Sequence, residues 1–373
     1  MKGAIVGGGG RFGAESGGLA LEFPGLSASQ AAKNFAILQS SRAKMIGKRG
    51  AKLRCIRVTT SARLHLGFLD LNGDLGRRFG SIGLAVDAFE TCVQLREAPS
   101  LCVLGEERER GSRLAIRIAD SLGIGAAKEL TIARAIPAHA GLGSGTQLAI
   151  AVASAFRRYA GWPLDPMADA LLLDRGGRSG VGAALFECGG LVVDAGRGAN
   201  TTIPPVVARV TFPPDWRVIL MLDFGIAGAH GEAERQAFAA LPRFPADSAG
   251  EICRRTLMQI LPGAAEQDFA AFGEGVSSIQ AILGDHFAPA QGGGRFTSAG
   301  VGRAAERLEA LGARGIGQSS WGPTGFAFAA DPEQAEFLAR RARAECESGV
   351  EFKICRVIDR GAETSEEQYA SNL

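Results

Sequence analysis

The sequence predicts a two-domain protein of mixed α and β structure, and three observations support this. The chain has 373 residues, more than a single hydrophobic core normally holds. Stretches that alternate apolar and polar residues are interspersed with stretches of helical periodicity over residues 53–358. Paired prolines at 204–205 and 213–214 separate two such groups of elements, which is typical of a connection between domains or of an edge segment.

The first group of elements is expected to begin with strands and to continue with helices. A strand pattern starts near residue 53 and is followed by a turn and further strands. A helix ended by Gly123, a strand over 129–137 and an apolar helix after Gly145 come next. A short helix with Pro166 in its first turn and a strand over 189–196 complete this half.

The second group of elements opens with a strand at Trp216. Helices are predicted around 232–241, 248–261 and 266–284, and a helix, a strand, a helix and a final strand follow up to residue 358. Strands that alternate with helices predict an α/β sandwich. We therefore expect a leader over 1–50, a first domain over 51–205, a second domain over 206–360 and a tail over 361–373.

The predicted leader contains the pattern Gly8-x-Gly10-x-x-Gly13, formally a dinucleotide-binding fingerprint. Gly17, Gly18 and Pro24 stand where the helix of that motif should run, so a flexible leader is the better interpretation.

The charges from Arg42 to Arg57 are all positive. A solvated lead-in, or an upstream start with Met45 as initiator, is favoured over a nucleic-acid or membrane contact, because no aromatic residues are interleaved with them.

The net charge and the spacing of the cysteines and histidines exclude several classes of protein function. The formal net charge is +2, which gives no argument for an anionic partner, and we expect no nucleic acid and no membrane span. The 7 cysteines and 4 histidines are scattered without C-x-x-C or H-E-x-x-H spacing. Reduced thiols in a cytoplasmic protein, without a His/Cys metal site, are therefore expected.

The chemically informative segment is AIPAHAGLGSGTQLAIAVASAF, residues 135–156. The unpaired N–H groups at a helix amino end attract anions, and glycines let a phosphate approach the backbone. We predict a phosphate site here, with a glycine-rich turn into a buried helix as the alternative. The predicted backbone and hydroxyl donors are Gly141, Leu142, Gly143, Ser144, Gly145 and Thr146.

The order Pro137-x-x-x-Gly141-Leu142-Gly143-Ser144 resembles the second signature of the GHMP superfamily, named for galactokinase, homoserine kinase, mevalonate kinase and phosphomevalonate kinase. SARLHLGFLDLNG and GQSSWGPTGFAFA stand where the first and third motifs are expected. The resemblance covers about residues 53–358. It implies an α+β fold with an S5-like amino-terminal domain, a ferredoxin-like carboxy-terminal domain and a ligand between them.

One departure from this pattern affects the predicted chemistry. Mevalonate-type kinases carry Ser-Gly-Ile-Asp with the Asp as base, whereas this chain has Ser179-Gly180-Val181-Gly182. A glycine cannot take the proton of an attacking hydroxyl. The chain instead is similar to the superfamily branch of β-ribofuranosylaminobenzene 5′-phosphate synthases of tetrahydromethanopterin biosynthesis, through ARLHLGFLDLNGDLGRRFGSIGLAV, IPAHAGLGSGTQLA, RSGVGAALFECGGLVVDAG and GQSSWGPTGF.

That resemblance implies a decarboxylating phosphoribosyltransferase that joins phosphoribosyl pyrophosphate to 4-hydroxybenzoate or 4-aminobenzoate and releases CO2 and pyrophosphate. The alternatives are a GHMP-type small-molecule kinase with a relocated base and a non-catalytic metabolite-binding member. The sequence leaves open which benzoate is used, which residue binds its carboxylate, and whether the chain forms a homodimer.

Further site residues are predicted from their position. Arg63 and His65 alternate on one strand and should share a face. A second phosphate contact is predicted at Arg178, Ser179 and Gly180, and a Mg²⁺ site at Ser144 and Asp174. Substrate binding is predicted at Arg63, His65, Arg77, Asp194, Ser319, Ser320, Trp321 and Gly322. Rim ion pairs, a turn cap at Asp194 and a packed Trp321 are the structural alternatives, and no residue is assigned as the catalytic base or acid.

Overall fold

The computed structural model describes residues 52–229, 231–346 and 349–370. The glycine motif of the predicted leader, the start of the basic run and Met45 lie outside the described residues. Residues 53–369 form one compact unit. In the part of the chain that is described, no helix combines the length and apolar character needed to cross a membrane.

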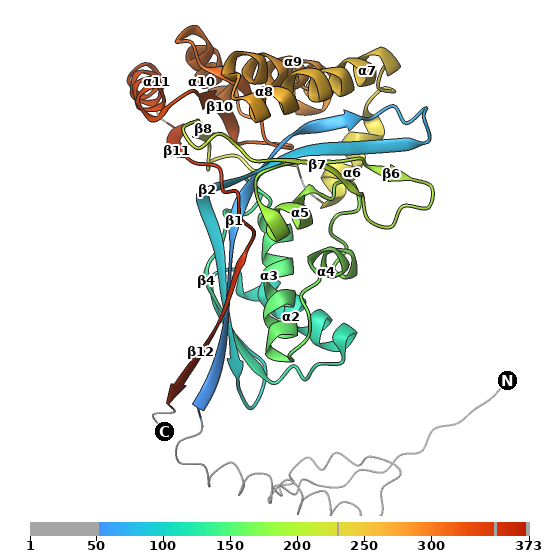
Figure 1. The fold of residues 1–373 in the computed structure, drawn as a ribbon, viewed down its shortest axis with the longest axis vertical. Coiled ribbons are helices and arrows are strands. Elements are labelled where there is room, and N and C mark those ends of the chain that lie inside the picture. Colours follow the sequence, from blue (N-terminus) through green and yellow to red (C-terminus); the bar gives the residue numbers. More distant parts are fainter. Residues whose placement is uncertain (1–51, 230, 347–348, 371–373) are drawn as a thin grey trace, which may run out of the picture. The chain divides into compact units, whose positions relative to one another are not determined.

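The larger of two sheets has the order β12-β1-β2-β4-β3, with further short strands attached to β2 (Figure 1). The two long strands β1 and β2 form its antiparallel centre. The strands are β1 (Lys52–Asp70), β2 (Arg77–Glu97), β3 (Cys102–Gly105), β4 (Lys128–Arg134), β5 (Leu191–Asp194), β6 (Arg197–Gly198), β7 (Val206–Val210) and β12 (Glu363–Ala370).

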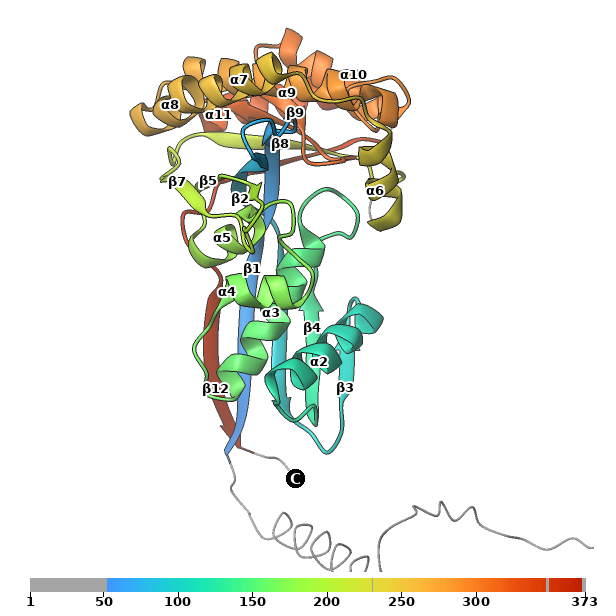
Figure 2. The ribbon, with the colours of Figure 1, turned by 90° about the vertical axis from the view of Figure 1, so that its right-hand side faces the viewer.

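Four helices cover one face of the larger sheet, as Figures 1 and 2 show. The central one, α3, is fully apolar from Leu148 to Ala153 and packs against β2 and its neighbouring helices. Gly123 ends α2 with a φ of 62°, as the sequence predicted. The four are α2 (Arg108–Leu122), α3 (Ser144–Tyr159), α4 (Pro166–Leu172) and α5 (Val181–Cys188).

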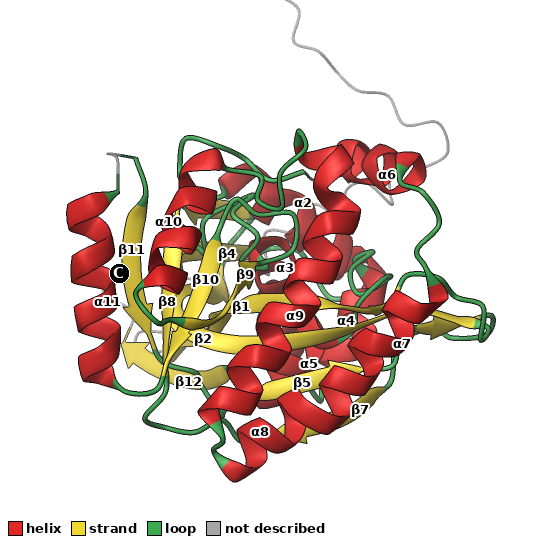
Figure 3. Ribbon diagram, turned by 90° about the horizontal axis from the view of Figure 1, so that it is seen from above, coloured by secondary structure: helices red, strands yellow, loops and turns green. Residues whose placement is uncertain are grey.

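The second sheet has four antiparallel strands in the order β11-β8-β10-β9. Its helices are seen from above in Figure 3. The strands are β8 (Arg217–Leu222), β9 (Arg314–Gln318), β10 (Gly325–Ala329) and β11 (Glu351–Cys355). The helical segments of this half are α6 (Gly231–Ala240), α7 (Ala246–Arg255), η1 (Thr256–Ile260), α8 (Leu261–Glu266), α9 (Phe269–Phe287), η2 (Ala288–Gln291), α10 (Ala299–Ala310) and α11 (Pro332–Glu345).

Strand β8 carries an uninterrupted run of apolar residues from Val218 to Leu222. Val218 and Leu220 belong to the hydrophobic cluster that also contains residues of β1, β2 and α9. Ile219 and Met221 belong to a separate cluster with α10 and α11. Because both faces of the strand are buried, alternation disappears. The first of these clusters joins the two sheets through one continuous core.

Two predicted domain limits differ from the structure. Val206–Val210 pairs with β5 as an edge strand of the larger sheet, so the chain enters the second sheet only at Arg217. Glu363–Ala370 is β12 and lies beside β1, so most of the predicted tail is a strand (Figure 2). Its outer position depends on a pairing between distant segments, for which local sequence gives no signal.

A register shift between β1 and β2 accompanies a change in what the side chains of β1 contact. It lies between Ser61 and Ala62, whose partners are Glu90 and Val86, so residues 87–89 of β2 have no partner on β1 in this pairing. Before the shift, Ile56 and Val58 pack in the cluster that contains α3. After it, even-numbered residues such as Leu64 join the cluster shared with the second sheet, and the odd-numbered Arg63 lies against the glycine loop that precedes α3.

We expect deletion of residues 363–373 to lower the midpoint of thermal unfolding by several degrees and to promote aggregation, because it uncovers the hydrogen-bonding edge of β1. Calorimetry and light scattering measure both effects. Glu366→Gln is the matched control, because it removes only the partly exposed ion pair between Arg54 Nε and Glu366 Oε1, which are 2.7 Å apart. It should lower the free energy of unfolding by less than about 1 kcal/mol. An unchanged unfolding midpoint in the shortened chain would contradict this role of β12.

Candidate functional site

The glycine-rich loop ends at the amino terminus of α3, as predicted. Gly141 and Gly143 have φ angles of 78° and 79°, in the left-handed region that favours glycine. Leu142 is fully buried and holds the loop to the core. No side chain caps α3, so the N–H groups of its first turn, at Ser144 and Gly145, point out of the helix end without intrahelical partners. The predicted anion-binding geometry of this loop is present.

Arg63 lies against this loop as a half-buried cation. Its backbone N–H donates to the carbonyl of Leu142 over 3.1 Å, and a Cβ atom at Gly143 would lie only 2.5 Å from its Cγ. The Nε and Nη1 atoms of Arg63 are buried and have no hydrogen-bond partner among the described residues. Burial lowers the pKa of Arg63 to about 10, so the side chain is still positive at neutral pH. An unpaired buried charge is strongly unfavourable, and a bound anion would relieve that cost.

Gly182 faces both Arg63 and the phosphate loop. A Cβ atom at Gly182 would lie 2.9 Å from Cγ2 of Thr146 and 3.8 Å from Nε of Arg63. Gln147 fixes this position, since its Nε2 donates to the Gly182 carbonyl over 2.9 Å and its Oε1 accepts from Thr60 Oγ1 over 2.6 Å. The three heavy atoms nearest to a Cβ atom at Gly182 therefore belong to Thr146 and Arg63, and none of the three is a carboxylate oxygen.

His65 is adjacent to Arg63 on the same face, as predicted. Its side chain is buried, and burial together with the charges of Arg63 and Arg178 lowers its pKa to about 3. The imidazole is therefore neutral at physiological pH. Nε2 has no hydrogen-bond partner among the described residues. A neutral imidazole carries one N–H and one lone pair, and in the tautomer with the proton on Nδ1 it is Nε2 that presents the lone pair.

Ser319 joins the three sequence motifs. Its hydroxyl accepts from the N–H of His65 over 3.0 Å and donates to the carbonyl of Gly141 over 2.8 Å. The N–H of Ser320 donates to the carbonyl of His65 over 3.4 Å. Ser319 is fully buried and both of these bonds are internal, so its hydroxyl positions the loop. Its role as a substrate ligand stays a prediction.

The remaining residues of the third motif have different environments. Ser320 is exposed, has a φ of 56° and lines a cavity with His65 and Trp321. Trp321 is only 6% exposed and packs edge-on against Phe238 and Phe287. Gly322 also has a left-handed φ, of 67°, and lies against Gln318. Ser320 and Trp321 thus remain candidates for ligand contact.

The predicted second phosphate contact is occupied by an internal carboxylate. Asp194 accepts the N–H of Gly180 over 2.9 Å and the hydroxyl of Ser179 over 3.3 Å, and it also accepts the N–H of Gly196 over 2.8 Å. Burial raises the pKa of Asp194 even though these donors favour its charged form. These groups therefore satisfy one another at the start of α5, and phosphate binding by Ser179 and Gly180 and substrate binding by Asp194 stay predictions.

Two arginines predicted as ligands, Arg77 and Arg178, have different surroundings in the structure. Arg77 donates to the carbonyls of Ala195 and Gly196, each over 3.0 Å, so it fixes that loop instead of reaching a ligand, contrary to the prediction. Arg178 is half-buried, pairs with Glu234 of α6 over 2.7 Å and lies over the ring of Phe238. Its charge acts on His65, so Arg178 borders the site.

The donor set does not fit a magnesium site held by protein carboxylates. Asp174 is paired with Arg117 over 2.7 Å and its side chain is 79% exposed, and its assignment as a magnesium ligand stays a prediction. The Arg117 guanidinium also lowers the pKa of that carboxyl. Within residues 52–370, as far as they are described, no three His, Cys, Asp or Glu side chains are grouped closely enough to hold a metal ion. Ser144 contributes one hydroxyl, whereas Mg²⁺ prefers several carboxylate or phosphate oxygens.

Two site residues escaped prediction from the sequence. Arg175 lies at the loop, where a Cβ atom at Gly145 would be 3.4 Å from its Nη1; its only sequence signal was its place before the glycines of the RGGRSG segment. Gln147 follows Thr146 directly, and its bonds to Gly182 and Thr60 were not predictable because both partners are distant in the chain.

Comparison with known proteins agrees with this architecture. The family description "GHMP kinases N terminal domain" matches residues 112–190 and "GHMP kinases C terminal" matches residues 260–348. Solved structures of similar fold include phosphomevalonate kinase from Streptococcus pneumoniae (TM-score 0.64, 13% identity, 82% of this chain and 99% of that one). Homoserine kinase from Cytophaga hutchinsonii is another (TM-score 0.58, 17% identity, 83% and 97%). The predicted α+β fold of the GHMP superfamily is confirmed.

Curated relatives identify the family within this superfamily to which the chain belongs. A protein named β-ribofuranosylphenol 5′-phosphate synthase from Archaeoglobus fulgidus is 36% identical over 241 residues, which cover 61% of this chain and 76% of the relative. The protein of that name from Methanothermobacter thermautotrophicus is 32% identical over 288 residues, covering 71% and 86%. The chain belongs to the β-ribofuranosylphenol 5′-phosphate synthase family, and it is accordingly an enzyme of the pentosyltransferase type.

Gly182→Asp should weaken binding of inorganic pyrophosphate about tenfold more than Gly182→Asn. Both substitutions introduce the same bulk near Thr146, but only the aspartate places a negative charge beside Arg63. Isothermal titration calorimetry measures the two dissociation constants. Equal affinities of the Asp and Asn variants would show that Arg63 does not act on the anion.

Proposed function

We propose that this enzyme joins the ribosyl 5′-phosphate group of phosphoribosyl pyrophosphate to a para-substituted benzoate and releases pyrophosphate and carbon dioxide, as a step of tetrahydromethanopterin biosynthesis. The observation that carries the proposal is the unpaired guanidinium of Arg63 beside the uncapped amino end of α3, with glycine at position 182. This arrangement favours a multiply charged anion, and the glycine at 182 offers no group to abstract a proton from a hydroxyl.

The bond changes balance without such a group. The bond between C1 of the ribose and the diphosphate oxygen breaks, and its electron pair leaves with pyrophosphate. A ring carbon of the benzoate, the one that carries the carboxylate, forms the new bond to C1. The bond from that carbon to the carboxylate then breaks, and its electron pair restores the aromatic ring as CO2 departs. Only the leaving diphosphate gains charge.

The residues around the loop would act on that charge. The N–H groups of Ser144 and Gly145 and the guanidinium of Arg63 are fixed before the reaction, so they stabilise the departing diphosphate without reorganisation. Arg175 adds a second cation near Gly145. The hydroxyls of Ser144 and Thr146 are further donors at the same helix end. A site of this kind suits a leaving group that gains negative charge in the transition state.

The names of the relatives support the choice of acceptor. A β-ribofuranosylphenol product corresponds to 4-hydroxybenzoate as acceptor, and 4-aminobenzoate is retained as the alternative within the same proposal. Mg²⁺ also belongs to the proposal, as an ion bound together with the diphosphate. Among the described residues no three His, Cys, Asp or Glu side chains are grouped closely enough to hold it, and no step above depends on it.

Supplied with phosphoribosyl pyrophosphate, 4-hydroxybenzoate and magnesium salt, the protein should form pyrophosphate and CO2 in equal amounts. Enzyme-coupled detection of pyrophosphate and release of labelled CO2 from the carboxylate measure the two products. Parallel reactions with 4-aminobenzoate identify the preferred acceptor. Formation of neither product with either benzoate would reject the proposal, and ATP-dependent phosphorylation of an added polyol would favour a kinase instead.

Replacing Ser144 and Thr146 together by Ala should raise the KM for phosphoribosyl pyrophosphate about tenfold or more, since two donors to the diphosphate are lost. The KM for the benzoate should change little. Ser179→Ala is the matched control, because that hydroxyl bonds to Asp194 and not to a ligand. Steady-state kinetics with each substrate varied in turn gives the constants. If the control and the double variant behave alike, the loop does not hold the diphosphate.

A further inference from the structure

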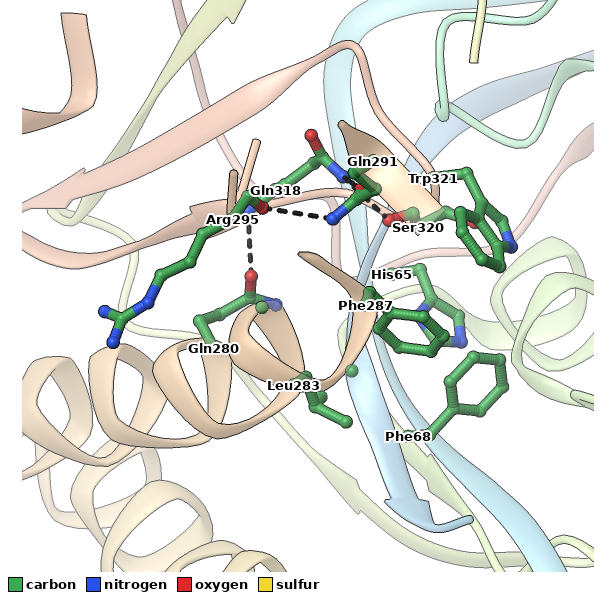
Figure 4. A pocket seen from close by; sticks show the side chains of 12 residues that line it. His65, Phe68, Gln280, Leu283, Phe287, Gln291, Arg295, Gln318, Ser320 and Trp321 are labelled. Carbon is green, nitrogen blue, oxygen red and sulfur yellow. Dashed lines mark hydrogen bonds between the residues drawn. The ribbon is translucent and has the colours of Figure 1, made fainter. Parts of the chain in front are cut away.

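The cavity that Ser320 lines also borders His65, on the side of the second sheet. Its lining differs in chemical character from the phosphate loop. Its wall contains Phe68, Phe287 and Trp321, which we call the aromatic cage, together with His65 (Figure 4). The ring centroids of His65 and Phe68 are 4.6 Å apart, and those of Phe287 and Trp321 are 4.9 Å apart. Aromatic walls of this kind suit a flat apolar ring.

The glutamine side chains of this cavity already have partners. The N–H of Gln318 donates to Gln280 Oε1 over 2.8 Å, and its Nε2 donates to Gln291 Oε1 over 2.7 Å (Figure 4). Gln280 Nε2 in turn donates to the carbonyl of Leu66 over 2.6 Å. Among the described residues of the wall, His65 Nε2 is the buried side-chain atom without a partner.

A buried acceptor without a donor is costly, and a donor brought by a ligand removes that cost. Nε2 of His65 presents a lone pair, so it attracts an O–H or N–H group and repels a carboxylate. The carboxylate end of a ligand is drawn instead toward the positive charges of Arg63 and Arg178, both of which act on the imidazole. A flat ring with a donor at one end and a carboxylate at the other matches both requirements.

We propose that the aromatic cage is the acceptor site, in which His65 Nε2 accepts a hydrogen bond from the para hydroxyl or amino group of the benzoate. The inference rests on the proposed function and adds to it the residue that selects the acceptor. The hydrogen bond also draws electron density from the O–H bond into the ring, which strengthens the ring carbon opposite the hydroxyl as a nucleophile. No proton needs to be transferred to the imidazole.

The size of the cavity identifies what the acceptor must displace. Its volume is about 30 Å³, enough for one or two water molecules but not for a benzene ring. The ring of Phe238, on α6, already lies among the cage residues, with centroid distances of 6.0 Å to Phe68, 5.6 Å to Phe287 and 5.2 Å to Trp321. The acceptor ring takes the place of this phenyl group.

The test compares two ligands that differ only in the donor, 4-hydroxybenzoate and 4-methoxybenzoate, by calorimetric titration with inorganic pyrophosphate present. The wild-type protein should bind the hydroxy compound about tenfold more tightly. In His65→Leu that preference should fall to near one. His286→Leu, a half-buried histidine outside the cavity wall, is the matched control and should keep the wild-type preference.

His65→Leu should fold, because an apolar side chain replaces a buried polar atom that has no partner, and its thermal unfolding midpoint verifies this. Phe238→Ala should bind 4-hydroxybenzoate several-fold more tightly, since no phenyl group has to leave. A preserved preference in His65→Leu, weaker binding by Phe238→Ala, or no binding of 4-hydroxybenzoate at all would overturn the inference. Product formation is measured separately, so a wild-type protein that releases pyrophosphate and CO2 would keep the proposed function even then.

Discussion

The site depends on one unfavourable arrangement, the largely desolvated guanidinium of Arg63, on which the carboxylate of Glu234 acts through its charge. The side chain is enclosed by the loop at Gly143 and by Gly182, and two of its nitrogen atoms have no partner in the described structure. Desolvation of this charge lowers the stability of the folded protein. Because electrostatic interactions are strong where water is excluded, an anion that binds beside Arg63 is attracted strongly and offsets that loss.

Two buried hydrogen-bonding side chains hold this arrangement in place. Gln147 ties β1 to α5 through α3, and Ser319 ties β1 to the glycine loop. Both lie in the interior with their bonds satisfied, which makes the geometry rigid. The helix end and the guanidinium are thus preorganised, and the second sheet contributes to the site through the turn that follows β9.

The chain shares its fold with kinases, and a single position indicates how the chemistry can differ. At Gly182 a carboxylate would both neutralise Arg63 and serve as a base, whereas glycine leaves the cation free and removes the base. The same scaffold then suits departure of a diphosphate better than activation of a hydroxyl. Fold alone would not distinguish these outcomes, because function resides in the site. The neutral His65 and the aromatic cage extend the difference to the acceptor side.

The sequence by itself determined the glycine loop, the helix behind it, the shared face of Arg63 and His65, and the glycine at 182, because these follow from local periodicity and from residue type. Only the tertiary structure decided which donors remain free. Ser179, Gly180 and Asp194 satisfy one another, Ser319 is used internally, and Asp174 pairs with Arg117. The register shift between β1 and β2 and the strand β12 were also not predictable, since each depends on pairing with a partner strand. Hydrogen-bond satisfaction is a property of contacts between distant segments, and no local pattern of residues reveals it.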